Sequence, residues 1–177
     1  MTIFLLGYMG CGKTTLGAPL ADRLGVNFID LDDYIEEQCE TTIVQIFNKV
    51  GDHGFREIEA KALQQVAMAA GGAVVAVGGG TPCQPGNMEL MNRCGLTIWL
   101  DPTLDRIVSR LCLPEQRVKR PLICDMTDDE IRAYAAAGIE QRSQHYSKAM
   151  LRFDSSRLES PEEIADTAAR LADILTA

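Results

Sequence analysis

A glycine-rich segment near the start of the chain constrains the fold more than any other feature. Residues 7–14 read G-Y-M-G-C-G-K-T and fit the pattern G-x-x-x-x-G-K-[ST]. The segment follows the short apolar run Ile3–Leu6 and precedes leucines with helical spacing, Leu16, Leu20 and Leu24. This context predicts a buried strand, a tight turn and a helix, which is the beginning of an α/β fold.

The same turn predicts a polyphosphate site. Glycines let backbone N–H groups approach phosphate oxygens, and the N-terminus of the following helix adds positive potential. We expect Lys13 to contact the β- and γ-phosphates, Thr14 to bind Mg²⁺ through its hydroxyl, and Thr15 to lie beside the α-phosphate. A glycine turn that binds nothing would not need lysine followed by threonine, so the predicted ligand is a nucleoside triphosphate. The predicted nucleotide-binding residues of this loop are Gly10, Cys11, Gly12, Lys13, Thr14 and Thr15.

Short apolar runs alternate along the chain with longer segments of helical periodicity. Such alternation is typical of βα units around a buried parallel sheet, so the predicted fold class is α/β. Thr127 with Glu130 forms a capping-box pattern, and Ser160 before Pro161 predicts the start of the last helix. The predicted strands are Ile3–Leu6, Phe28–Ile29, Ala73–Val77, Ile98–Leu100 and Met150–Phe153.

Helical periodicity fails between Cys112 and Asp125. Prolines and basic residues dominate this stretch, among them Pro114, Arg120 and Pro121. Such a composition predicts a mobile surface loop, and this loop is the best candidate for a lid over a bound ligand.

Length and charge limit the classes of protein to which the chain can belong. With 177 residues, 46% of them hydrophobic and 24% charged, we expect one domain around one core. The net charge of −8 opposes binding to nucleic acid or anionic membranes, since both require a basic surface. No apolar stretch approaches the roughly 18 residues of a membrane span, and no signal-peptide pattern precedes the first strand. We therefore expect a cytoplasmic protein without a membrane partner, and we expect it to be a monomer.

The cysteines show no metal-binding or disulfide pattern. They have irregular spacing, no C-x-x-C pair and only His53 and His145 as companions. We expect reduced thiols, without a zinc site or a disulfide. The six cysteines are Cys11, Cys39, Cys83, Cys94, Cys112 and Cys124.

Two carboxylates follow the second predicted strand. Asp30 and Asp32 are two residues apart, so an extended chain would place both on one side of its end. One carboxylate could then orient metal-bound water and the other a hydroxyl group. The same pair is also typical of the acidic first turn of an ordinary helix.

Two further segments carry features of an acceptor site. In G-F-R-E-I-E, Arg56 and Glu59 lie at i,i+3 on a helix, where the acid can orient the guanidinium toward a carboxylate ligand. A surface ion pair of little energetic value is the alternative. Residues 78–80 are three glycines that end the most apolar strand, at the sheet edge where α/β folds bind ligands. The alternative there is a plain turn.

Together these segments resemble the shikimate kinase family, a branch of the P-loop fold related to nucleoside monophosphate kinases, over nearly the whole chain. The resemblance implies a three-layer α/β/α fold with a five-stranded parallel sheet in the order 2-3-1-4-5. It also implies a substrate-binding region at about residues 31–60 and a lid at about residues 112–125. The implied reaction transfers the γ-phosphoryl group of ATP, with Mg²⁺, to the 3-hydroxyl of shikimate in aromatic amino acid biosynthesis.

On the acceptor side, the resemblance implies roles for four residues and their neighbours. Asp32 would contact substrate hydroxyls and act as the base. Arg56 and Arg142 would bind the shikimate carboxylate, and Gly79 would donate its N–H to the substrate. The predicted substrate-binding residues are Asp32, Arg56, Gly78, Gly79, Gly80 and Arg142.

On the nucleotide side, Arg120 in the segment R-P-L at residues 120–122 matches the lid arginine of the family. It would cover the ATP phosphates and act in catalysis with Lys13 and Asp32. Asp30 would support the magnesium shell through water, beside Thr14. Arg110 and Arg157 would be nucleotide neighbours. Val77 departs from the family, where many members have serine or threonine near magnesium.

Two alternatives remain open at this point. A kinase for gluconate or a nucleoside monophosphate would share the phosphate loop and the fold. The second alternative is a non-catalytic ATP-binding switch or scaffold, which would show no turnover. The arginine segment with the glycine triplet favours a small hydroxy acid as acceptor.

Overall fold

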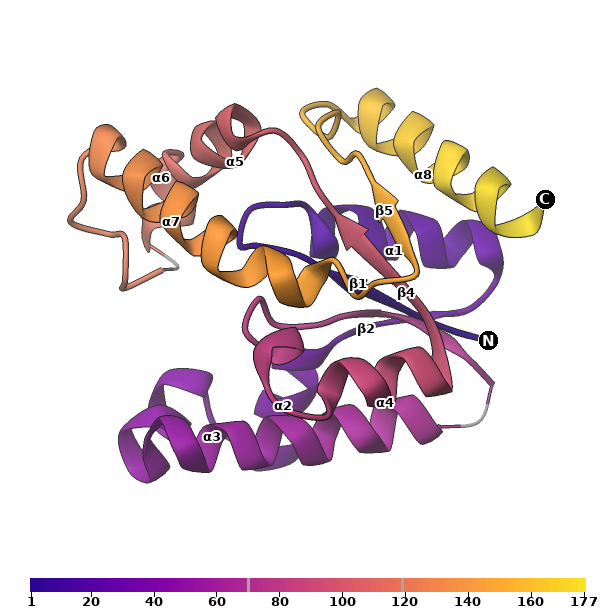
Figure 1. Ribbon diagram of the computed structural model, residues 1–177, viewed down its shortest axis with the longest axis horizontal. Helices are drawn as coiled ribbons and strands as arrows, with labels where there is room; N and C mark the ends of the chain where they lie inside the picture. The colour runs from indigo at the N-terminus through magenta and orange to yellow at the C-terminus, as the bar shows by residue number, and fades with distance from the viewer. Residues whose placement is uncertain (70, 119) are drawn as a thin grey trace.

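The computed structural model describes residues 1–69, 71–118 and 120–177, and in it five strands form one parallel sheet with helices on both faces (Figure 1). The strands are β1 (Thr2–Leu6), β2 (Asn27–Asp30), β3 (Ala73–Ala76), β4 (Gly95–Leu100) and β5 (Leu151–Phe153). Their order is β2-β3-β1-β4-β5, and all neighbours are parallel. This order confirms the predicted α/β class and the topology that the resemblance implies.

Helices connect the strands, and their starts follow the capping pattern of the sequence. The hydroxyls of Thr127 and Ser160 accept hydrogen bonds from the amides of Glu130 and Glu163, so both predicted helix starts are confirmed. The α-helices in the described ranges are α1 (Lys13–Leu24), α2 (Leu31–Cys39), α3 (Ile43–Met68), α4 (Asn87–Cys94), α5 (Leu104–Leu111), α6 (Pro114–Val118), α7 (Asp128–Tyr146) and α8 (Pro161–Thr176). A short 3-10 helix, η1 (Thr81–Cys83), follows β3.

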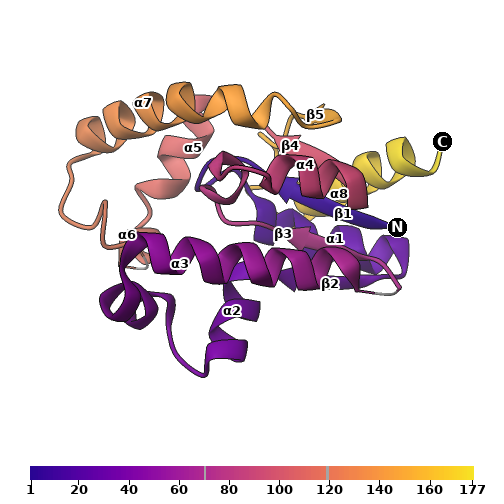
Figure 2. The same ribbon diagram turned by 60° about the horizontal axis from the view of Figure 1, so that its bottom comes forward.

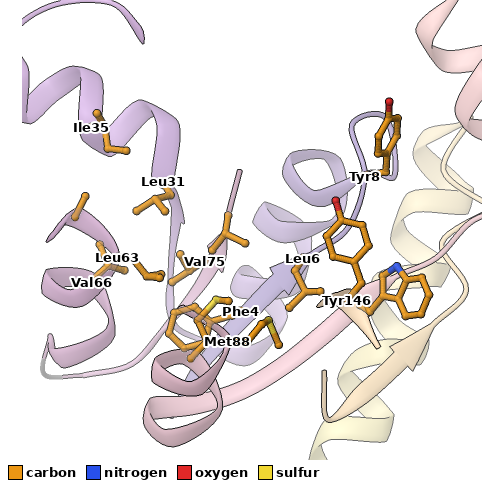
Figure 3. Packing of buried hydrophobic residues seen from close by; sticks show 14 of the residues in the cluster. Phe4, Leu6, Tyr8, Leu31, Ile35, Leu63, Val66, Val75, Met88 and Tyr146 are labelled. Atoms are coloured by element: carbon orange, nitrogen blue, oxygen red, sulfur yellow. The ribbon is translucent and has the colours of Figure 1, made fainter. Parts of the chain in front are cut away.

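Alternating side chains of β1 divide the core into two layers. Phe4 and Leu6 pack with α3, α4 and α7, whereas Ile3 and Leu5 pack with α1 and α8. Figure 3 shows part of the first layer, including Phe4 and Met88. Because helices cover both faces of the sheet, a ligand can reach it only at the ends of the strands.

The strands point toward the loop after β1, at the left of Figure 1. Two helices extend past this end of the sheet in Figure 1, the first half of α3 from below and α6 from above. Figure 2 shows the same helices in a second view. Helix α3 bends at Gly51, whose backbone has φ 72° and ψ −178°. A φ in this range suits glycine, so the bend has a local cause in the sequence.

The segment expected to be an irregular loop contains the short helix α6, so that part of the prediction is wrong. Proline suits the first turn of a helix, because its missing N–H is not needed there. The turn from Pro114 is closed by the amides of Gln116 and Arg117, which donate to the carbonyl of Leu113 at 2.9 and 3.1 Å. Within the described ranges, every helix is too short or too polar to cross a lipid bilayer.

All six cysteines of the sequence are free thiols in the structure.

Candidate functional site

The glycine-rich loop joins β1 to α1 and keeps backbone conformations that other residues rarely adopt. Gly10 has φ 79°, and Gly12, the N-cap of α1, has φ 100°. A methyl group on Gly12 would lie 2.2 Å from Cδ1 of Leu158, so both the conformation and the space require glycine there. The loop therefore presents bare backbone at the N-terminus of a helix, which suits an anion.

Lys13 lies folded over this loop. Its ammonium group donates hydrogen bonds to the carbonyls of Gly7 at 2.9 Å and Tyr8 at 3.2 Å, and it lies 3.6 Å from Sγ of the buried Cys11. Among the described residues, Lys13 has no carboxylate partner. Its charge is held at the loop without an ion pair among the described residues, which fits the predicted contact with phosphates.

Thr14 and Asp30 provide a hard-oxygen pair beside the loop. The Thr14 hydroxyl donates to Oδ2 of Asp30 at 2.8 Å, while Oδ1 of Asp30 accepts from the amide of Asp32 at 3.1 Å. Hydroxyl and carboxylate oxygens are ligands that Mg²⁺ prefers, together with water and phosphate. The described residues hold no cluster of three metal-binding side chains, so these two residues fit an ion that is completed by a nucleotide and water.

The structure corrects the geometry predicted for the two aspartates. Asp30 ends β2 and caps α2, so Asp32 lies in the first turn of that helix and not on an extended strand. The strand stops there because the Asp30 side chain satisfies the free amide of Asp32. The two carboxylates are still close enough to influence each other.

The surroundings of Asp32 make it a weaker acid than usual. Partial removal of the carboxyl group from water is the main cause that raises the pKa of Asp32 to about 6, although the residue as a whole is exposed. The negative charges of Asp30 and Glu59 raise the pKa further, and Lys13 opposes them. At neutral pH most of the group is ionised, and a carboxylate with this pKa can accept a proton readily.

Arg56 is braced by a buried carboxylate. Its Nη1 donates to Oε2 of Glu59 at 2.9 Å, and Glu59 has a side-chain exposure of only 1%. The other oxygen of Glu59 accepts from the hydroxyl of Thr81 at 2.6 Å. The i,i+3 pair predicted from the sequence is present, and the burial of Glu59 shows that it is not a surface ion pair.

Arg142 approaches the same region from α7. Its guanidinium lies 5.3 Å from the centroid of the Tyr8 ring. One turn later in α7, the buried Tyr146 donates its hydroxyl to the carbonyl of Gly79 at 2.6 Å. Figure 3 shows the ring of Tyr146 beside Leu6, with its hydroxyl directed away from Phe4 and Met88.

The glycine triplet after β3 is the meeting point of these groups. A methyl group built on Gly78 would lie 3.1 Å from Oε1 of Glu59 and 3.4 Å from Oδ1 of Asp32. On Gly79 it would lie 3.3 Å from Arg142, and on Gly80 it would lie 3.1 Å from Arg56. The structure thus gathers the predicted acceptor residues around bare backbone at the carboxyl end of β3.

The predicted nucleotide-side arginines have different surroundings. Arg110 donates to the carbonyls of Gly10 and Ser155, both at 3.1 Å, so it lies against the phosphate loop. Arg120 donates to the carbonyl of Gln116 within the predicted lid, and burial lowers its pKa. The exposed Arg157 lies 3.8 Å from Glu163 of α8. The roles of all three remain predictions.

Sequence reasoning missed three residues of this region: Tyr8, Thr81 and Tyr146. Thr81 directly follows the glycine triplet, and Tyr146 lies at i,i+4 from Arg142, so helical spacing was the signal that could have indicated Tyr146. Two surface hollows lie away from this region. One, of about 400 Å³, lies between α2 and α3, and the other, of about 360 Å³, lies between α7 and the sheet. Neither includes a predicted site residue.

Three features at one sheet edge define a P-loop kinase: a glycine-rich loop whose lysine has no ion-pair partner in the described ranges, a hydroxyl–carboxylate pair, and a glycine triplet lined by arginines. The family model described as shikimate kinase matches residues 9–172. The chain therefore belongs to the shikimate kinase family.

Curated relatives and solved structures agree with this assignment. A shikimate kinase of Phocaeicola vulgatus is 44% identical over 92% of this chain and 91% of its own length. The crystal structure of shikimate kinase from Bacteroides thetaiotaomicron matches with a TM-score of 0.90 and 39% identity, covering 100% of this chain and 99% of that one. Shikimate kinase from Acinetobacter baumannii in complex with shikimate matches with a TM-score of 0.82 and 28% identity, covering 99% and 92%. A gluconokinase of Sinorhizobium meliloti 1021, at 14% identity and a TM-score of 0.55 over 99% and 95%, shares the fold alone.

Proposed function

We propose that this protein transfers the γ-phosphoryl group of ATP to the 3-hydroxyl of shikimate, giving ADP and shikimate 3-phosphate for aromatic amino acid biosynthesis. The observation that carries the proposal is the grouping of Asp32, Arg56 and Arg142 around the glycine triplet, beside Lys13. Two guanidinium groups provide the planar donors that fit a carboxylate, and the aspartate provides an acceptor for a hydroxyl proton. Shikimate carries both a carboxylate and hydroxyl groups.

In this reaction the residues of the chain position the reactants and neutralise charge. Lys13 would leave the loop carbonyls for the phosphate oxygens. As the hydroxyl oxygen of the acceptor bonds to the γ-phosphorus, the bond from that phosphorus to the bridging oxygen of ADP would break, and Asp32 would accept the hydroxyl proton. Arg56 and Arg142 would hold the carboxylate at the far side of the ring. Thr14, directly, and Asp30, through water, would hold Mg²⁺, which supplies positive charge against the phosphate oxygens.

We also propose roles for the parts of the chain that flank the site. The chain acts as a single domain in which residues 31–60 bind the acceptor and residues 112–125 form a lid with Arg120 over the phosphates. Closure of this lid would exclude water, which otherwise competes as acceptor. We propose a cytoplasmic monomer with no nucleic-acid or membrane partner, and light scattering during gel filtration tests the monomer directly.

An ADP-release assay tests the function. Purified protein with ATP and Mg²⁺ is supplied with shikimate, gluconate, a nucleoside monophosphate or no acceptor. We expect ADP release that depends on shikimate and a phosphorylated product that mass spectrometry detects. ADP release only with another acceptor would overturn the substrate assignment, and ADP release that no acceptor changes would mean that the chain is not a shikimate kinase.

A further inference from the structure

Glu59 is a buried carboxylate whose two oxygens each accept one hydrogen bond. Arg56 donates to Oε2 at 2.9 Å, and the Thr81 hydroxyl donates to Oε1 at 2.6 Å. Glu59 is 1% exposed and Thr81 is 0% exposed, so water does not compete at this contact. A buried ion holds a fixed orientation only when all of its oxygens have partners, because an unsatisfied oxygen in the interior is costly.

The orientation of Arg56 depends on Glu59 more than on its other neighbours. The carboxylate of Asp52 lies 3.5 Å from Nε of Arg56, but its side chain is 75% exposed, and Nε is a buried donor with no hydrogen-bond partner among the described residues. The ring of Phe55 lies below the guanidinium at 5.2 Å, which leaves rotation in the plane free. Glu59 therefore determines where the free donors of Arg56 point.

Thr81 is itself held rigidly. Its amide donates to the carbonyl of Gly78 at 3.1 Å, and its own carbonyl accepts from the side chain of the buried Asn87 at 2.9 Å. A methyl group on Gly78 would lie 3.0 Å from the Thr81 hydroxyl, so the hydroxyl is packed against the first glycine of the triplet. One residue thus fixes both the glycine turn and the carboxylate that braces Arg56.

We propose that Thr81 is a positioning residue of the acceptor site, whose hydroxyl holds Glu59 so that Arg56 presents its donors to the substrate carboxylate. This inference rests on the proposed function, in which Arg56 binds that carboxylate. It assigns to the residue after the triplet a part in selecting acidic acceptors, which Thr81 plays through Glu59 and Arg56.

Thr81→Val tests the inference, because a methyl group can neither donate a hydrogen bond nor approach an oxygen to 2.6 Å. We expect the KM for shikimate to rise about tenfold or more, with kcat and the KM for ATP changed less than about threefold, since the loss falls on acceptor binding. The preference in kcat/KM for shikimate over its methyl ester should fall by a similar factor. Thr81→Ser keeps the hydroxyl and should restore both values to within about threefold of the wild type.

Thr97→Val is the matched control. Thr97, in β4, is also 0% exposed, and its hydroxyl donates to Asn92 of α4 at 2.6 Å, away from the predicted acceptor residues. Thr97→Val should lower the melting temperature without changing the preference for shikimate over its methyl ester. An unchanged preference in a folded Thr81→Val variant, or a Thr81→Ser variant as impaired as Thr81→Val, would overturn the inference. Failure of the proposed function would look different, because the wild type itself would then show no shikimate-dependent turnover.

Discussion

The hydroxyl of Tyr146, in the last turn of α7, donates a 2.6 Å hydrogen bond to the carbonyl of Gly79, 67 residues earlier in the chain. Tyr146 is 0% exposed, so its hydroxyl has no access to water in place of this carbonyl. The bond fixes the peptide plane after Gly79 and ties the glycine triplet to the helix that carries Arg142. The glycine triplet is therefore held from both β3 and α7.

Tyr146→Phe removes this bond and keeps the ring. We expect a loss of about 1–3 kcal/mol in the free energy of unfolding, because the half-buried carbonyl of Gly79 loses its partner, and a rise in the KM for shikimate. Thermal melts and a coupled assay measure the two effects. Tyr34→Phe is the control, since that hydroxyl makes only a long contact of 3.4 Å with Gln65 at an exposed position. Equal effects of the two variants would contradict the role given to Tyr146.

Lys13→Ala removes the charge that is held at the phosphate loop. We expect turnover to fall by at least about 10², the scale of losing one preorganised electrostatic contact. The fold should survive, because Lys13 bonds only to loop carbonyls and a sulfur atom. Lys61→Ala, which removes an exposed lysine of α3, should leave turnover unchanged. A folded Lys13→Ala protein with normal turnover would refute the assignment of the phosphate loop.

Asp32 should give the activity an acidic limit. Its pKa is raised to about 6, so the side chain is ionised above that pH and loses its negative charge as the pH falls below about 6. We therefore expect kcat/KM to decrease below about pH 6 if the ionised group accepts the hydroxyl proton. Asp32→Asn should lose most turnover while still binding ATP, as calorimetric titration can show. Near-normal turnover of Asp32→Asn would place the base elsewhere or make it unnecessary.

Arg56→Lys keeps the charge but loses the planar pair of donors. We expect the KM for shikimate to rise far more than the KM for ATP, because lysine cannot form the paired contact with a carboxylate. Methylation of the shikimate carboxylate should weaken binding to the wild type and cost much less in Arg56→Ala, where the interaction is already absent. Strictly additive losses in binding from methylation and from Arg56→Ala would mean that Arg56 has only a structural role.

Gly138→Ala should destabilise the protein, against the usual trend. In a helix interior, alanine is favoured over glycine by about 1 kcal/mol. Here a methyl group on Gly138 would lie 2.6 Å from the ring of Tyr8, which is 3% exposed and has little room to move. A lower melting temperature would support this packing between α7 and the phosphate loop, whereas a higher one would show that the ring can move aside.

Much of the fold and the conformation of the glycine-rich loop could be predicted because they depend on local patterns. The phosphate loop is continuous in the sequence, its glycines determine backbone conformations directly, and the strand before it and the helix after it have clear periodicities. The capping residues Thr127 and Ser160 act within one turn, so they indicated helix starts reliably. The pair of Arg56 and Glu59 was visible for the same reason, since i,i+3 neighbours meet on any helix.

Local pattern was not sufficient where a helix start or a distant segment controls the geometry. Period-two alternation put Asp30 and Asp32 on one strand edge, but the capping bond of Asp30 ends the strand and starts α2 between them. The lid prediction treated prolines as breakers, although Pro114 begins a helical turn.

The remaining features depend on contacts between residues far apart in the chain. The burial of Glu59, its bond to Thr81 over 22 residues and the bond from Tyr146 to Gly79 over 67 residues exist only when α3, α7 and the turn after β3 pack at one sheet edge. Residue types and spacing predicted which groups could bind phosphate or carboxylate. Long-range packing decides which of them are buried, how strongly they interact and where they point, because burial removes competing water and leaves each polar group only the partners that the fold provides.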